Sequence, residues 1–195
     1  MADSTRITLL QRIRDQHDES SWEDFVVHYR PYIFAVLRNM GVPNDAADDL
    51  VQEVLLRTWK ALPEFDYRPG GCKLRTWLGL ICRNTLRSQV RKDQSRQVRE
   101  SHIDAAGLDS DPEIEAIVEK EWRLYISNLA WQNIEGSFVD NVKQSFLLSA
   151  AGENSVAIAA KLGLAESSVR VNKQRVTAAL CKEILRLESQ LDFPS

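Results

Sequence analysis

Apolar residues recur at intervals of three and four along most of this chain, which is the period of an amphipathic α-helix. The sequence offers no alternating run of β-branched residues of the kind that indicates a strand. The pattern predicts four helices in the first half of the chain, over about residues 5–16, 20–41, 44–61 and 73–92. Residues 62–72, "LPEFDYRPGGC", interrupt the period with helix breakers. We therefore expect an all-α fold.

Local signals set the expected helix ends. Ser20 and Glu23 have the spacing of a capping box, and Gly41 ends the same helix. Pro31 falls inside it and is expected to kink it. Asn44 or Asp45 is expected to cap the next helix.

The second half begins after a change in composition. Residues 93–111 lack sustained periodicity and are polar, which predicts a flexible acidic linker. Asp111 and Pro112 then have the arrangement of a helix cap followed by proline at the first helical position. We expect two small helical domains, a four-helix unit over residues 1–92 and a second domain over 112–195. A helical stripe is expected to continue through Trp131, Ile134, Phe138, Val142 and either Phe146 or Leu147.

The most specific local pattern is "NSVAIAAKLGLAESSVRVNKQRVTAALCKEIL", at 154–185. Asn154 is expected to cap a short helix, and Gly163 permits a sharp turn into a second one. This spacing is typical of a helix-turn-helix. The inward side of the first helix is predicted to hold Val156, Ile158, Ala159 and Leu162, and that of the second Val169, Val176, Leu180, Ile184 and Leu187.

Polar side chains on the second of these helices suggest contact with DNA. Arg170, Gln174 and Arg175 fall away from the apolar stripe, where they can donate to phosphates and purine edges. Lys173 falls nearer the stripe, with its amine able to reach out. Together with Ser168 these are our candidate DNA contacts. A helical hairpin with solvated basic residues has the same pattern and stays open.

Charge is segregated although the net charge is only −3. Residues 73–99 hold eight Lys or Arg and one acid, 104–121 hold seven acids and one Lys, and 161–186 hold six bases and two acids. On a helical wheel the basic segment divides. One side is expected to carry Leu74, Trp77, Leu78, Ile81 and Thr85, and the other Arg83, Arg87 and Arg91. The preceding helix instead presents an acidic and amide face, made of Asp48, Asp49, Gln52 and Glu53.

These residues together resemble a known family. The segment "DAADDLVQEVLLRTWKALPEFDYRPGGCKLRTWLGLICRNTLRSQVRK" is similar to region 2 of bacterial sigma-70 factors of the extracytoplasmic-function (ECF) type, and the helix-turn-helix resembles their region 4. The resemblance implies a transcription initiation factor that binds RNA polymerase core, directs it to promoters and helps to open the duplex. Its partners would be the β′ clamp coiled coil, the β flap and promoter DNA. Whether an anti-sigma factor also binds stays open.

The resemblance also assigns roles by position. Asp48, Asp49, Gln52 and Glu53 match the helix that docks on the clamp coiled coil. The −10 element would be held by Phe65, Tyr67, Lys73, Arg83, Asn84, Arg87 and Arg91. The −35 element would be read by Ser168, Arg170, Lys173, Gln174 and Arg175. Trp77 is expected in the protein's own core.

Other classes of function have less support. The three cysteines are far apart and show no zinc or disulfide spacing, and we expect neither metal nor cofactor. No Gly-rich phosphate loop or nucleophile and base pair indicates an enzyme. No apolar run is long enough for a leader or membrane span, which predicts a cytoplasmic protein. The alternatives are a helix-turn-helix regulator that acts without core polymerase and a helical protein-interaction module.

Overall fold

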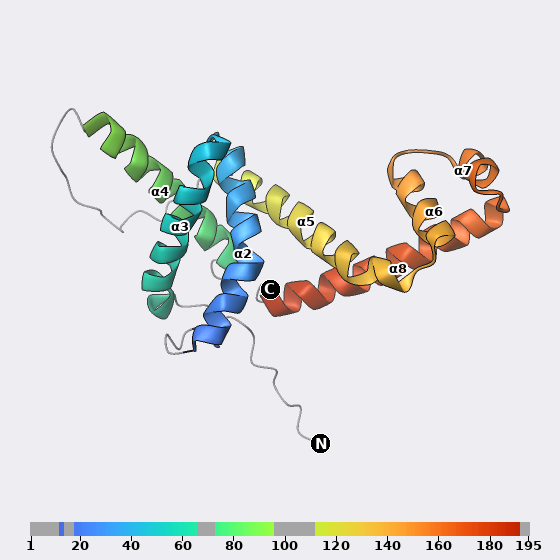
Figure 1. The fold of residues 1–195 in the computed structure, drawn as a ribbon, viewed down its shortest axis with the longest axis horizontal. Helices are drawn as coiled ribbons and strands as arrows, with labels where there is room; N and C mark the ends of the chain where they lie inside the picture. The colour runs from blue at the N-terminus through green and yellow to red at the C-terminus, as the bar shows by residue number, and fades with distance from the viewer. Residues whose placement is uncertain (1–11, 14–17, 66–72, 96–111, 192–195) are drawn as a thin grey trace, which may run out of the picture. The chain divides into compact units, whose positions relative to one another are not determined.

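The computed structural model describes residues 12–13, 18–65, 73–95 and 112–191. All regular secondary structure in these residues is helical, which confirms the all-α prediction (Figure 1). Most of the predicted helix over 5–16, and residues 96–111 of the predicted linker, lie outside the described residues. The elements are α2 (Glu19–Asn39), α3 (Asn44–Ala61), η1 (Leu62–Glu64), α4 (Leu74–Ser95), α5 (Pro112–Ile134), η2 (Glu135–Ser137), α6 (Asp140–Ala150), α7 (Ser155–Leu162) and α8 (Glu166–Leu191).

The chain forms two compact units. We call Met1–Tyr125 together with Gln190–Ser195 the N-terminal unit, and Ile126–Ser189 the C-terminal unit. The division falls inside α5 and near the end of α8, whereas the sequence suggests a division in the linker. The first half of α5 therefore packs with the N-terminal unit.

Helix α2 begins differently from the prediction. Its cap is Asp18, whose Oδ1 accepts from the Ser21 backbone N–H at 3.0 Å. The prediction that Ser20 and Glu23 form a capping box was therefore wrong. The Ser21 hydroxyl also donates to the Asp18 carboxylate, and these two hydrogen bonds lower the pKa of Asp18. The helix then continues through Pro31 to Asn39. Helix α3 has Pro43 at its cap position and no side-chain capping hydrogen bond, so the predicted cap at Asn44 or Asp45 was wrong.

The core of the N-terminal unit joins α2, α3 and α4. Each helix contributes an apolar stripe at three- and four-residue spacing, and the side chains on it are almost fully enclosed. The buried set includes Phe25, Tyr29, Tyr32, Ile33, Val36 and Leu37 of α2, Leu50, Val51, Val54 and Leu55 of α3, and Leu74 and Leu78 of α4. The wheel prediction for Leu74, Leu78 and Thr85 is confirmed by this burial.

The first half of α5 completes this core. Trp122 is 1% exposed, with its ring 5.3 Å from that of Tyr32 in an edge-on arrangement and 6.2 Å from that of Tyr29. Arg75 of α4 donates from Nε to Glu119 Oε1 at 2.7 Å. One turn further along α4, a Cβ placed on Gly79 would lie 2.3 Å from Val118 Cγ2. Glycine is therefore what permits α4 and α5 to approach this closely.

The C-terminal unit begins with a break in the predicted stripe. Residues 135–137 form a 3-10 turn and Val139 is the cap of α6, so the helix does not continue through Phe138. The ring of Trp131 nevertheless stacks on that of Phe146, with centroids 5.4 Å apart. A small core of Ile158, Ala159 and Val169, with Leu148, Leu162 and Leu164 packed against it, joins α6, α7 and α8.

Candidate binding surfaces

The acidic face of α3 is on the surface, as predicted. Asp48, Asp49 and Gln52 are exposed and Glu53 is half-buried. Asp48 accepts from Arg30 at 2.9 Å, an exposed pair that contributes little to stability. In the described part of the chain, the side chains of Asp49 and Gln52 form no hydrogen bond or ion pair. Their oxygens and amide are thus available to a partner.

Glu53 and Leu56 give this face two further properties. Glu53 accepts from Arg57 Nε at 2.7 Å, which fixes the carboxylate along the helix. Leu56 follows one turn after Gln52 and is 48% exposed. The face is therefore acidic with an apolar end, and Leu56 is a residue that the charge pattern did not indicate.

An aromatic pair lies where α4 begins. The rings of Phe65 and Trp77 are 4.6 Å apart at 36°, and both side chains are half-buried. Trp77 therefore belongs only partly to the core, because its half-buried ring packs against the ring of Phe65. Lys73 is half-buried beside this pair in the sequence, and Tyr67 lies outside the described residues. Two partly accessible rings in contact offer a stacking surface to a planar ligand.

The basic face of α4 is shorter than predicted. Asn84, Arg87 and Arg91 are exposed, but Arg83 is only 7% exposed, so its place on the outer face was wrong. Arg83 follows Gly79 by one turn, on the side of α4 that packs against α5. A wheel of α4 alone cannot show this second packing side.

The helix-turn-helix is built as its sequence predicts. The Asn154 side chain accepts from the Ala157 backbone N–H at 2.9 Å and caps α7. Gly163 ends α7 in the left-handed region, with φ 64°, which a residue with a side chain rarely adopts. Leu164 then donates its backbone N–H to Ala159 and packs on the small core. Val156 is 64% exposed, so its predicted inward position was wrong.

The five predicted contacts on α8 all have exposed side chains: Ser168, Arg170, Lys173, Gln174 and Arg175. Lys173, which was expected nearer the stripe with its amine reaching out, is exposed as well. Two of the arginines already have intramolecular contacts, because Arg170 donates to Glu166 at 2.5 Å and the guanidinium of Arg175 lies 5.7 Å from the Phe138 ring centre. The opposite stripe is confirmed at Val169, Val176 and Leu187, which are buried.

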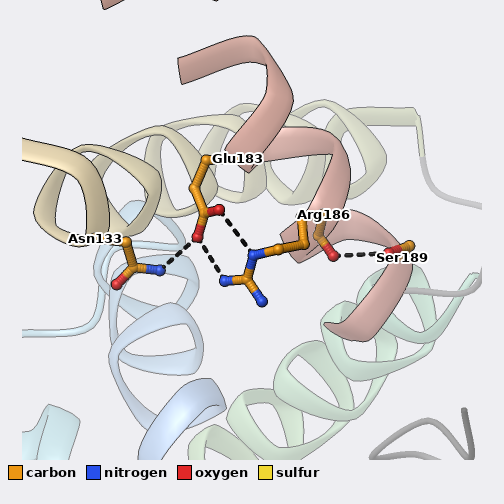
Figure 2. A network of polar contacts seen from close by, with 4 residues as sticks. All are labelled: Asn133, Glu183, Arg186 and Ser189. Atoms are coloured by element: carbon orange, nitrogen blue, oxygen red, sulfur yellow. Dashed lines mark hydrogen bonds and ion pairs between the residues drawn. The ribbon is translucent and has the colours of Figure 1, made fainter. Parts of the chain in front are cut away.

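Farther along α8, a polar network joins it to α5. Figure 2 shows Glu183 accepting from Asn133 Nδ2 at 2.8 Å and from both Nε and Nη2 of Arg186, with Ser189 donating to the Arg186 carbonyl. The hydrogen bonds from Arg186 are the main reason that the pKa of Glu183 falls to about 2, against the opposing effect of burial. The Glu183 side chain is 14% exposed. This network joins the later turns of α8 to the end of α5.

Comparison with known proteins decides the family. The chain is 33% identical over 175 residues to the ECF RNA polymerase sigma factor EcfG of Rhodopseudomonas palustris, an alignment that covers 89% of this chain and 90% of that relative. The chain belongs to the ECF sigma factor family. Residues 25–96 also match the model for Sigma-70 region 2.

One further relative matches this chain over a shorter span. The ECF sigma factor RpoE of Cereibacter sphaeroides is 26% identical over 115 residues, covering 59% of this chain. The alignment spans 61% of the length of that relative. Among solved structures, that of CnrH in complex with the cytosolic domain of CnrY is 23% identical and covers 89% of this chain and 93% of its own, with a TM-score of 0.36.

The region 2 match of this ECF sigma factor includes the acidic face, the aromatic pair and the basic face of α4. The described residues contain no group of three His, Cys, Asp or Glu side chains placed to hold a metal ion. None of the described helices has a stretch long and apolar enough to cross a membrane.

Sequence reasoning missed two sets of residues. Glu119 and Trp122 lie beyond the predicted linker, so nothing in the local pattern linked them to α2 and α4. Asn172 lies among the predicted DNA contacts of α8, but its Nδ2 donates to Ser145 of α6 at 3.2 Å. Asn172 lies three residues after Val169 and four residues before Val176, which puts it on the same side of the helix as these two valines. This spacing was the available signal that Asn172 faces inward.

Proposed function

We propose that this chain binds RNA polymerase core, directs it to specific promoters and assists promoter melting. One observation carries the proposal. In the segment that matches Sigma-70 region 2, an acidic helix face and a half-buried aromatic pair are both at the surface, and the exposed Asn84, Arg87 and Arg91 lie on the helix that holds Trp77. A protein contact and a single-strand contact thus have separate places in one unit.

The polymerase contact is assigned to α3. Asp49 and Gln52, which have no partner in the described part of the chain, would bind the clamp coiled coil of the β′ subunit, with Asp48 and Glu53 beside them. The ion pair of Asp48 with Arg30 is exposed, with side chains 60% and 54% exposed, so exchanging it for an intermolecular pair costs little. The acidic face requires a basic partner surface.

The −10 contact is assigned to the beginning and outer face of α4. A base taken out of the duplex loses its stacking, and an aromatic side chain returns roughly 1–3 kcal/mol per base. Phe65 and Trp77 offer such a surface, with Tyr67 in the segment between them. Lys73, Arg87 and Arg91 would hold the phosphates, and Asn84 the edge of the captured base. Arg83, being buried, is the weakest member of the predicted set.

The −35 contact is assigned to α8, through Ser168, Arg170, Lys173, Gln174 and Arg175. Residues 1–92 would then act at the −10 element and residues 112–195 at the −35 element and the β flap, joined by 93–111. Each domain binds weakly alone, and joining them on one polymerase raises the effective concentration of each. The protein would act in the cytoplasm, by binding rather than by catalysis.

The test is run-off transcription with purified bacterial core enzyme on a genomic library that includes the region upstream of this gene. We expect promoter-specific transcripts, and their absence contradicts the proposal. Asp49→Lys should lower core affinity by tenfold or more, whereas Glu23→Lys, an equal charge change on an exposed residue of α2, should leave it unchanged. Tight DNA binding without core would indicate a conventional regulator instead. Core-independent activity that survives Arg87→Glu would indicate a protein-interaction module.

A further inference from the structure

Helix α8 is held against the rest of the C-terminal unit by an apolar seam with one polar contact in it. Val169 and Val176 are both fully buried, and Asn172 lies between them at i+3 and i−4, on the same side of the helix. The Asn172 side chain is half-buried, and its Nδ2 donates to Ser145 Oγ at 3.2 Å. The polar contact therefore lies within the packing surface.

Ser145 is a fixed acceptor. It is fully buried on α6, and its own hydroxyl donates to the Asn141 carbonyl at 2.6 Å. The hydroxyl proton is thus committed to α6, and the lone pairs of Oγ remain to accept from Asn172. Three residues beyond Asn172, the guanidinium of the exposed Arg175 lies 5.7 Å from the centre of the Phe138 ring, which precedes α6. Of these contacts, the hydrogen bond from Asn172 to Ser145 is the directional one that joins α8 to α6.

A directional contact can fix the rotation of α8, which packing of the two valines cannot. Apolar packing is nearly independent of direction, so Val169 and Val176 tolerate a small rotation or slide of α8. A hydrogen bond to a buried partner does not, and one buried polar side chain is a known means of fixing helix register. Recognition side chains must be held to within about 0.5 Å and 10–20° of their productive geometry. Ser168, Lys173 and Gln174 project from the same helix, so a rotation would displace all three.

We propose that Asn172 is a positioning residue, which through Ser145 fixes the rotation of α8 and thereby sets how strictly the −35 element is read. The inference rests on the proposed function, because it assumes that α8 reads DNA. Asn172 acts through Ser145 and α6 and need not touch a base.

The test compares stability with discrimination in the full-length chain. Asn172→Val replaces the amide by an apolar side chain of similar size, which suits the seam between two valines. We expect unfolding midpoints and core affinity to equal or exceed those of the wild type. A base-pair mismatch ordinarily costs roughly 5- to 150-fold in affinity, and we expect Asn172→Val to lose about tenfold of this discrimination. The probes are the duplex selected by wild-type holoenzyme from a pool randomised in the upstream element, and its single-base variants.

A second variant guards against an indirect effect. Ser145→Ala removes the acceptor and leaves Asn172 in place, and it should reproduce the loss of discrimination. Thr177→Ala, at an exposed position of α8, should change neither quantity. The inference is overturned if both variants discriminate like the wild type, or if affinity for all duplexes falls equally together with stability. If wild-type holoenzyme selects no upstream element, the proposed function fails instead.

Discussion

Replacing Trp122 by alanine tests whether the first half of α5 belongs to the N-terminal unit. Trp122 is 1% exposed and lies against Tyr29, Tyr32 and Tyr125. A buried tryptophan removes about 150–250 Å² from water, which at about 25 cal/mol per Å² amounts to roughly 4–6 kcal/mol. A compact unfolded state lowers this by roughly 10–40%. We expect Trp122→Ala to reduce the free energy of unfolding by about 3–5 kcal/mol.

The assay is urea unfolding followed by circular dichroism, together with hydrogen exchange of the α2 amides. With a urea dependence of about 2 kcal/mol/M, the midpoint should fall by roughly 2 M and α2 should exchange faster. Leu124→Ala is the matched control, because this leucine is on the same helix and 51% exposed. If α2 exchange is unchanged in Trp122→Ala, α5 belongs wholly with the second domain, as the linker pattern suggests, and the packing argument is refuted.

Three further outcomes follow from local geometry. Gly79→Ala places a methyl group 2.3 Å from a β-branched methyl of Val118 and should cost about 1–3 kcal/mol of stability, measured by thermal unfolding. Glu183→Gln should cost about 1–2 kcal/mol at neutral pH. Since the folded pKa of about 2 lies below the ordinary 4.5, wild type should lose this stability as pH falls from about 4.5 to 2, and the variant should not. Arg87→Glu should weaken promoter binding about tenfold without changing stability, whereas Arg83→Ala should chiefly lower the unfolding midpoint.

The helical elements were predictable because their signals are local. The turn at Gly163 and the cap at Asn154 each depend on one residue and its immediate neighbours, and both are present as predicted. The start of α5 at Pro112 has the same kind of origin. The cap of α2 was misplaced because Asp18 and Ser20 are both good capping residues two positions apart, and the sequence does not rank them.

The candidate surfaces were predictable where only one side of a helix packs. The acidic face of α3 meets this condition, since Leu50, Val54 and Leu55 turn inward together. Helix α4 does not, because α5 covers a second side of it. Val156 was misplaced for a related reason, because the small core against which the short helix α7 packs leaves part of the expected apolar stripe in solvent.

The helices, the turn of the helix-turn-helix, the segregation of charge and the resemblance to a family could be read from the sequence, because each depends on residue spacing within one element or on a linear motif. Three features needed the folded structure: the burial of Arg83, the contact of the Trp77 ring with that of Phe65, and the hydrogen bond of Asn172 to Ser145. Each of these depends on which element packs against which. That choice is made by contacts between residues far apart in the chain, and periodicity within one helix carries no record of them.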